Sequence, residues 1–249
     1  MEERVVLVTG GSRGIGAETA VLAAEKGWNV VISYRSQEDK ANEVIKQVES
    51  LGQKGLAIKS DVGSEAEVIA LFEQIDQAFG RLDALVNNAG ILETACTVVE
   101  MSVARLQRVF NVNIVGSFMC AQQAIKRMGQ SHGGNGGAIV NLSSAAARLG
   151  SANEFVDYAA SKGAIDTFTL GLAKEVGGDG IRVNAVRPGL IETDIHADSG
   201  DANRAERLKG GVPMQRTGSA REVATTIVWL MSDEASYVNG ALLDVSGGR

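Results

Sequence analysis

The chain of 249 residues is poor in the residues that build disulfide scaffolds, zinc sites and linkers. Its two cysteines, Cys96 and Cys120, and its two histidines, His132 and His196, are scattered. This spacing excludes a disulfide framework and a recognisable Cys/His metal site, and it favours a reducing compartment. Only two prolines are present, which leaves little material for a linker between domains.

Basic residues and long apolar runs are also scarce. The 24 Lys+Arg against 30 Asp+Glu give a formal net charge of -6, which argues against nucleic-acid binding because phosphate neutralisation needs clustered basic residues. No apolar run approaches the roughly 20 residues that span a bilayer, and the first residues lack the features of a secretory signal. We therefore expect a cytoplasmic protein without nucleic-acid or membrane partners.

The composition is otherwise that of an ordinary globular domain, with 45% hydrophobic and 22% charged residues. Glycine is the exception, because 30 of 249 residues is about 12%, against about 7% in average proteins, and no Gly-X-Y period accompanies it. These glycines must therefore serve particular positions in the fold.

Short β-branched runs alternate with segments of helical period along most of the chain. The predicted strands are Val5–Thr9, Asn29–Ser33, Gly55–Lys59, Ala84–Asn87, Ala138–Ser143, Ile181–Val186 and Ala241–Val245, and the predicted helices are Ile15–Lys26, Glu38–Leu51, Glu65–Phe79, Val103–Met128, Val156–Val176 and Ala220–Met231. Strands that are apolar on both faces predict a parallel sheet covered by helices on both sides. The expected fold class is α/β, a doubly wound Rossmann fold with a seven-stranded parallel sheet, forming one catalytic domain over residues 1–249.

One segment does not fit this alternation. Residues 190–218 follow the sixth predicted strand without clear periodicity, and long connections of this kind are often lids. We predict a substrate lid at about 190–218. The apolar side chains that suggest a partly apolar pocket there, although each suits the core equally well, are Leu190, Ile191, Ile195, Val212 and Met214.

A glycine-rich segment, Thr9-Gly10-Gly11-Ser12-Arg13-Gly14-Ile15-Gly16, separates the first predicted strand from the first helix. A dinucleotide pyrophosphate would meet free backbone N–H groups and the positive end of a helix dipole at this position. The spacing Gly-x-x-x-Gly-x-Gly is a variant of the commoner dinucleotide fingerprint. A tight turn without a ligand is the alternative, and the flanking strand and helix favour the phosphate site.

Tyr158 and Lys162 lie one turn apart on the same face of a predicted helix. A phenol with a pKa near 10 is a poor proton donor or acceptor at neutral pH unless a neighbouring cation stabilises its phenolate. Such a pair alone is more often a surface feature. Here Ser143 and Ser144 end the preceding strand, so all four residues would meet at the carboxyl edge of the sheet, where this fold binds ligands.

These motifs together resemble the short-chain dehydrogenase/reductase family, in its compact single-domain branch, over essentially the whole length. The further fragments that carry the resemblance are Asp61-Val62, Asn87-Asn88-Ala89-Gly90, Asn111-Val112-Asn113-Ile114-Val115-Gly116, Arg187-Pro188-Gly189 and Thr193. The nearest members are bacterial 3-oxoacyl-[acyl-carrier-protein] reductases and glucose 1-dehydrogenase-like enzymes.

The resemblance implies a catalytic set of Asn113, Ser144, Tyr158 and Lys162. Ser144 would orient the substrate, Lys162 would bind the nicotinamide ribose and lower the pKa of Tyr158, and Asn113 would hold a water that connects Lys162 to solvent. The stretch before Tyr158 is one residue longer than the family pattern would imply, so Ser143 stays as a second candidate for the role of Ser144. The implied cofactor-binding residues are Gly10, Ser12, Arg13, Gly14, Ile15, Gly16, Arg35, Asp61, Val62, Asn88, Ala89, Gly90, Tyr158, Lys162, Pro188, Gly189, Ile191 and Thr193.

The end of the second predicted strand bears on the choice between NADP(H) and NAD(H). An acidic residue there would bind a free ribose 2′-hydroxyl, whereas an arginine would accommodate a 2′-phosphate. The strand ends without a carboxylate, and Arg35 with Arg13 forms a cradle of two cations. NADP(H) is therefore favoured. Glu38 and Asp39 follow at the start of a helix, where they complement its dipole.

We thus expect an NADP(H)-dependent oxidoreductase that transfers hydride between nicotinamide and a carbonyl or secondary alcohol, with Tyr158 as general acid and base. The alternatives are a 3-oxoacyl-[acyl-carrier-protein] reductase and a non-catalytic NADP(H)-binding regulator on the same fold. An acidic carrier protein would need a basic patch at the site mouth. The candidates, unless they are solvated helix faces, are Lys126-Arg127 and the group Arg204, Arg207 and Lys209.

The resemblance also implies an oligomer. Family members assemble as homotetramers through their long fourth and fifth helices and their last strand. The corresponding surfaces here are the predicted helix over 103–128 and the predicted strand over 241–245.

Overall fold

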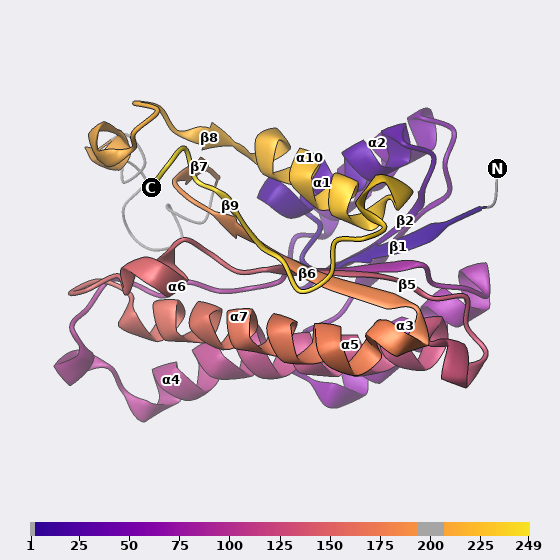
Figure 1. The fold of residues 1–249 in the computed structure, drawn as a ribbon, viewed down its shortest axis with the longest axis horizontal. Coiled ribbons are helices and arrows are strands. Elements are labelled where there is room, and N and C mark those ends of the chain that lie inside the picture. Colours follow the sequence, from indigo (N-terminus) through magenta and orange to yellow (C-terminus); the bar gives the residue numbers. More distant parts are fainter. Residues whose placement is uncertain (1–2, 194–206) are drawn as a thin grey trace.

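A single parallel sheet organises the protein, whose computed structural model describes residues 3–193 and 207–249 (Figure 1). Its seven strands lie in the order β3-β2-β1-β4-β5-β6-β9. They are β1 Val5–Val8, β2 Asn29–Tyr34, β3 Gly55–Lys59, β4 Ala84–Asn87, β5 Gly137–Leu142, β6 Ile181–Pro188 and β9 Leu242–Val245. This confirms the predicted fold class. The strand order reverses between β1 and β4, which is where a doubly wound sheet opens a crevice at its carboxyl edge.

Helices cover both faces of the sheet (Figure 1). One face carries α1 Gly14–Glu25, α2 Glu38–Ser50 and α10 Ala220–Met231; the other carries α3 Glu65–Phe79, α4 Val103–Phe110, α5 Gly116–Met128 and α7 Val156–Val176. Each face has its own hydrophobic core. Along β1, Val6 and Val8 pack into the core beneath α1, α2 and α10, whereas Val5 and Leu7 pack into the core beneath α3, α5 and α7. Because successive side chains of a strand point to opposite faces, a strand buried on both sides is apolar throughout.

The predicted helix over 103–128 is two helices joined by a π-helical turn, Asn111–Val115. The N–H of Gly116 donates to the carbonyl of Asn111, one residue further back than in an α-helix. This turn holds the buried Asn113, whose side chain bonds the loop after β4 and α7. Single π-turns of this kind are frequent at functional sites.

The segment predicted as a lid has its two ends joined. Strand β7, Ile191–Glu192, pairs in parallel with β8, Gly218–Ser219. The predicted lid residues Ile195 and Arg204 lie outside the described residues. Short elements that the sequence pattern did not predict are the helix α6, Ala146–Leu149, and the 3-10 turns η1 Val98–Glu100, η3 Gln130–His132, η4 Gly177–Asp179, η5 Lys209–Gly211 and η6 Asp233–Ala235. Within residues 3–193 and 207–249, no helix is both long and apolar enough to cross a membrane.

Candidate active site

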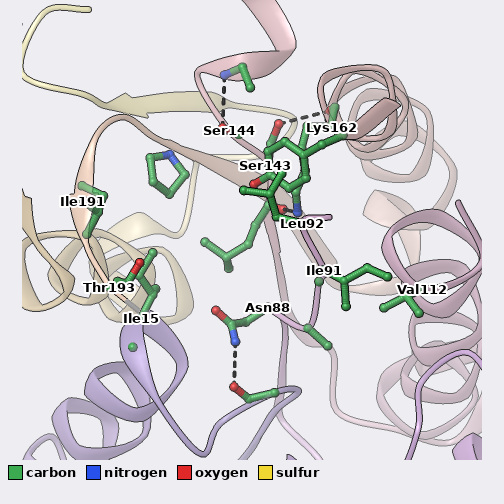
Figure 2. A pocket seen from close by; sticks show the side chains of 18 of the residues that line it. Ile15, Asn88, Ile91, Leu92, Val112, Ser143, Ser144, Lys162, Ile191 and Thr193 are labelled. Atoms are coloured by element: carbon green, nitrogen blue, oxygen red, sulfur yellow. Dashed lines mark hydrogen bonds between the residues drawn. The ribbon is translucent and has the colours of Figure 1, made fainter. Parts of the chain in front are cut away.

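A pocket with a volume of about 830 Å³ opens at the carboxyl edge of the sheet, within the range of small-molecule and cofactor sites. The ends of β1, β2, β4, β5 and β6 and the first turns of α7 contribute to its walls. Every predicted catalytic or cofactor-binding residue lines this pocket except Gly16 and Asn113, which lie directly behind its wall. Figure 2 shows Ser144 and Lys162 toward one end of the pocket, away from Ile15 and Thr193.

The glycine-rich loop has the backbone that a phosphate cradle requires. Gly10 and Gly14 adopt φ values of +64° and +56°, which disfavour any residue with a Cβ. A Cβ at Gly16 would lie 2.5 Å from the Nδ2 atom of Asn88 and 2.6 Å from the carbonyl oxygen of Gly10. Gly16 therefore allows α1 to pack closely on the loop, although it does not line the pocket. The first N–H groups of α1 and its positive dipole end face the space where a pyrophosphate would bind.

Asn88 holds this loop in place from the end of β4. Its Nδ2 atom donates to the carbonyl oxygens of Thr9, at 2.8 Å, and Gly10, at 3.1 Å. Its backbone N–H donates to the hydroxyl of Thr9 at 3.0 Å. The loop and the end of β4 are thus one unit, in which Asn88 reaches the loop from the neighbouring strand (Figure 2).

Lys162 is buried beneath the catalytic end of the pocket. Its Nζ atom donates to the carbonyl oxygen of Leu142 at 2.6 Å and lies 5.6 Å from the centre of the Tyr158 ring. Burial lowers the pKa of Lys162 to about 8, although the carboxylate of Asp166 opposes this shift. The ammonium is therefore largely charged at neutral pH, and a cation at this position favours the phenolate form of a neighbouring tyrosine.

Asn113 lies behind the pocket wall and connects two of its segments. Its Oδ1 atom accepts the N–H of Ile91 at 2.8 Å, while its Nδ2 atom donates to the carbonyl of Ile91 at 3.0 Å and to the hydroxyl of Ser161 at 3.1 Å. A Cβ at Gly90 would lie 3.4 Å from the Oδ1 atom of Asn113 and 3.6 Å from the Nζ atom of Lys162. Gly90 therefore leaves room for a ligand beside both residues.

The two serines at the end of β5 differ in environment. Ser143 is only 3% exposed, and its hydroxyl donates to the carbonyl oxygen of Lys162 at 3.2 Å. Ser144 is half-buried, and its hydroxyl oxygen accepts the N–H of Ala146 at 3.1 Å. Figure 2 draws this contact, in which the Ser144 hydroxyl is the acceptor, so that its own hydrogen is left to donate. The geometry therefore favours Ser144 over Ser143 as the hydroxyl that meets a substrate.

Arg13 and Arg35 line the other end of the pocket. Arg35 is exposed after β2, and its Nε atom lies 4.0 Å from a carboxylate oxygen of Asp61. The second oxygen of Asp61 accepts the N–H of Gly63 at 2.9 Å. Glu38 and Asp39 occupy the first turn of α2 and do not line the pocket.

The pocket is also lined by residues that no sequence motif marked. They are Leu92, Leu149, Phe155 and Arg249, and the predicted apolar residues Leu190 and Ile191 line the same pocket. Val212 is buried outside the lining, and Met214 is exposed. The side chains of Leu149 and Phe155 belong to the irregular stretch between β5 and α7, and Arg249 reaches the pocket because β9 returns the chain to the carboxyl edge.

One candidate basic patch is wrong. Lys126 and Arg127 lie in the last turn of α5, which returns to the amino edge of the sheet and is followed by β5. There the Arg127 guanidinium forms two hydrogen bonds of 2.7 and 2.6 Å with Asp76. In the other group, Arg207 lies 3.9 Å from the carboxylate of Glu154, a residue of the pocket lining.

Comparison with known proteins gives consistent relatives over nearly the full length. The family described as Enoyl-(Acyl carrier protein) reductase matches residues 10–249. The uncharacterised oxidoreductase YgfF of Escherichia coli K12 is 52% identical over 98% of this chain and 99% of its own length. The 3-oxoacyl-[acyl-carrier-protein] reductase FabG of Staphylococcus aureus Mu50 is 36% identical over 97% of this chain and 96% of its own length. A short-chain dehydrogenase from Burkholderia cenocepacia J2315, crystallised with NADP, superposes with a TM-score of 0.90 at 34% identity. The match covers 99% of this chain and 97% of the Burkholderia chain.

Proposed function

Because the chain belongs to the short-chain dehydrogenase/reductase family, an oxidoreductase family acting on CH-OH groups, we propose that it reduces a carbonyl substrate with NADPH and that Tyr158 is its general acid. The observation that carries this proposal is the meeting of Tyr158, Lys162 and Ser144 in one pocket, opposite the glycine-rich loop. When bound, the nicotinamide supplies the hydride.

The chain's own residues then handle the proton and the carbonyl oxygen. Tyr158 donates its phenolic proton to that oxygen, and the Ser144 hydroxyl donates a hydrogen bond to it. The buried ammonium of Lys162 stabilises the resulting phenolate and binds the nicotinamide ribose. Asn113 orders a water that carries the replacement proton from solvent toward Lys162.

The glycine-rich loop, Asp61, Val62, Asn88, Ala89 and Gly90 bind the rest of the cofactor in this proposal, with Pro188, Gly189, Ile191 and Thr193 closing over it. Arg35 and Arg13 bind the 2′-phosphate. Two observations support NADP(H): the end of β2 presents Arg35 without a carboxylate, and the Burkholderia relative was crystallised with NADP. The segment at 190–218 acts as the substrate lid.

The same proposal includes a homotetramer. Large apolar side chains are exposed along α4, the π-helical turn Asn111–Val115, α5, α7 and the turn η1, and exposed apolar surface of this kind commonly marks a protein contact. They are Val98, Val99, Val103, Val115, Phe118 and Leu170. A monomer mass by light scattering at micromolar concentration would contradict this part of the proposal.

Two other functions remain to be separated from this one. The FabG relative supports reduction of an acyl chain on a carrier protein, for which Arg207 and Lys209 are the described members of the second candidate basic group. A carrier substrate would then show salt-sensitive turnover, and its small thioester analogue would not. A non-catalytic regulator would bind NADPH without turnover.

The deciding experiment follows NADPH oxidation with a panel of ketones, ketoacyl thioesters and sugars. Turnover that depends on Tyr158 is expected with at least one class of carbonyl. Tight NADPH binding without turnover on any class would favour the regulator.

A further inference from the structure

An ion pair outside the catalytic and cofactor sets is buried behind the pocket. The Nε atom of Arg105, on α4, donates to one carboxylate oxygen of Asp157 at 2.7 Å, and its Nη2 atom donates to the other at 3.2 Å. Arg105 is 9% exposed and Asp157 is 3% exposed. Neither residue lines the pocket, so any effect of the pair on chemistry must pass through another residue.

The pair connects three segments around the reacting end of the pocket. The Nη1 atom of Arg105 donates to the carbonyl oxygen of Thr94 at 2.5 Å, in the loop after β4. That loop carries Leu92 of the pocket lining. On the other side, the Asp157 carboxylate accepts the backbone N–H of Tyr158 at 2.9 Å. A single guanidinium on α4 therefore holds the loop directly and the backbone of Tyr158 through the carboxylate of Asp157.

The need for this support follows from the position of Tyr158 in the first turn of α7. First-turn N–H groups have no partner within the helix, and the N-cap residue Phe155 provides no side-chain cap. Burial disfavours the charged form of Asp157, but the hydrogen bonds from Arg105 and the Tyr158 N–H outweigh it and hold the pKa of this carboxyl below its usual value. Asp157 thus remains an ionised acceptor that Arg105 keeps in place.

We propose that Arg105, acting through Asp157, is a positioning residue for Tyr158 in the reductase reaction. This inference rests on the function proposed above, because it assumes that Tyr158 transfers the proton. The pair fixes the first turn of α7 relative to α4 and the loop after β4, and so sets where the phenol meets the substrate oxygen. Misplacing a reacting group by about 1 Å costs roughly a hundredfold in rate.

The test uses Arg105→Lys and the double variant Arg105→Met with Asp157→Asn. The lysine keeps the charge but lacks the planar fork that spans Asp157 and Thr94. The double variant leaves no unpaired charge, which keeps the fold accessible if the single change destabilises it. We expect kcat for carbonyl reduction to fall roughly ten- to a hundredfold in both, with NADPH affinity unchanged. Arg108→Met is the matched control, because Arg108 bonds Glu93 of the same loop from the same helix without contacting Asp157, and its kcat should stay at the wild-type value.

A second readout separates positioning from general structural support. Single-turnover rates are measured after the double change is introduced into Tyr158→Phe. If the pair acts through Tyr158, the residual rate should not fall further, whereas a structural role would lower it in both backgrounds. Two results would overturn this inference but leave the proposed function standing. One is that the double change lowers the rate equally in the wild-type and Tyr158→Phe backgrounds. The other is that the double change leaves kcat unchanged although the wild-type reaction depends on Tyr158. A Tyr158→Phe enzyme that keeps its full rate would overturn the proposed function and this inference with it.

Discussion

Replacing Arg35 by alanine tests the cofactor assignment most directly. A guanidinium that forks onto the 2′-phosphate forms charge-assisted hydrogen bonds, which contribute about 1.5–3 kcal/mol. The Arg35 side chain is 64% exposed, so solvent screening places the loss near the lower end, at about 1.5 kcal/mol. That value corresponds to about tenfold weaker NADPH binding. NADH has no 2′-phosphate, so its affinity should stay nearly constant.

Fluorescence titration with both cofactors measures these changes. Arg35→Lys should retain part of the affinity, because it keeps the charge without the fork, and adding Arg13→Ala to Arg35→Ala should deepen the loss. Lys59→Ala is a suitable control, because Lys59 is exposed at the end of the neighbouring strand β3 and does not line the pocket. Equal weakening of NADPH and NADH would mean that Arg35 supports the fold instead, and a wild type that prefers NADH would refute the assignment.

Other changes address the catalytic end and the core. Tyr158→Phe removes the transferable proton but keeps the ring, so kcat should fall by orders of magnitude while NADPH affinity in a titration stays the same. Ser144→Ala should lower kcat strongly and Ser143→Ala only slightly, in the same steady-state assay. Lys162 is charged below its pKa of about 8 and neutral above it, so reduction should decline as the pH rises through that value, and Lys162→Met should remove this step from the pH profile. The Arg187 guanidinium donates to one oxygen of the buried Asp166 carboxylate, whose other oxygen has no hydrogen-bond partner among the described residues. Arg187→Met would therefore leave this carboxylate buried without the guanidinium. Urea unfolding should show a loss of about 3–5 kcal/mol, much of which Asp166→Asn in the same chain should restore.

The sheet and the ends of its strands could be predicted because their determinants are local. Strands buried on both faces are apolar without interruption, and a glycine-rich turn between strand and helix has one main use in this fold. Residues at the ends of parallel strands meet at one edge whatever the lengths of the intervening helices. That geometry is why residues as distant in sequence as Gly14 and Thr193 line one pocket.

The features that sequence reasoning missed depend on tertiary contacts or on irregular backbone. One π-turn changes the helical period too briefly to alter the pattern of apolar residues around Asn113. Arg105 resembles any helical surface arginine until α7 is packed against α4. The position of Lys126 and Arg127, by contrast, follows from the topology alone, because a helix that follows a parallel strand returns to the amino edge, and its last turn therefore lies away from the site.

The connection between Ser144 and Tyr158 shows how an irregular stretch can join two elements that both belong to the core. The stretch between Ser144 and Tyr158 contains α6 and two non-glycine residues with left-handed backbone, Ser151 at φ 47° and Asn153 at φ 62°. Such conformations are costly and persist only where the surroundings impose them. The flanking elements β5 and α7 both bury residues in the core, and Ser144 and Tyr158 line the same pocket. Ser144 and Tyr158 can therefore meet in one pocket although the connection between them is irregular, because the core fixes the elements on both sides of that connection.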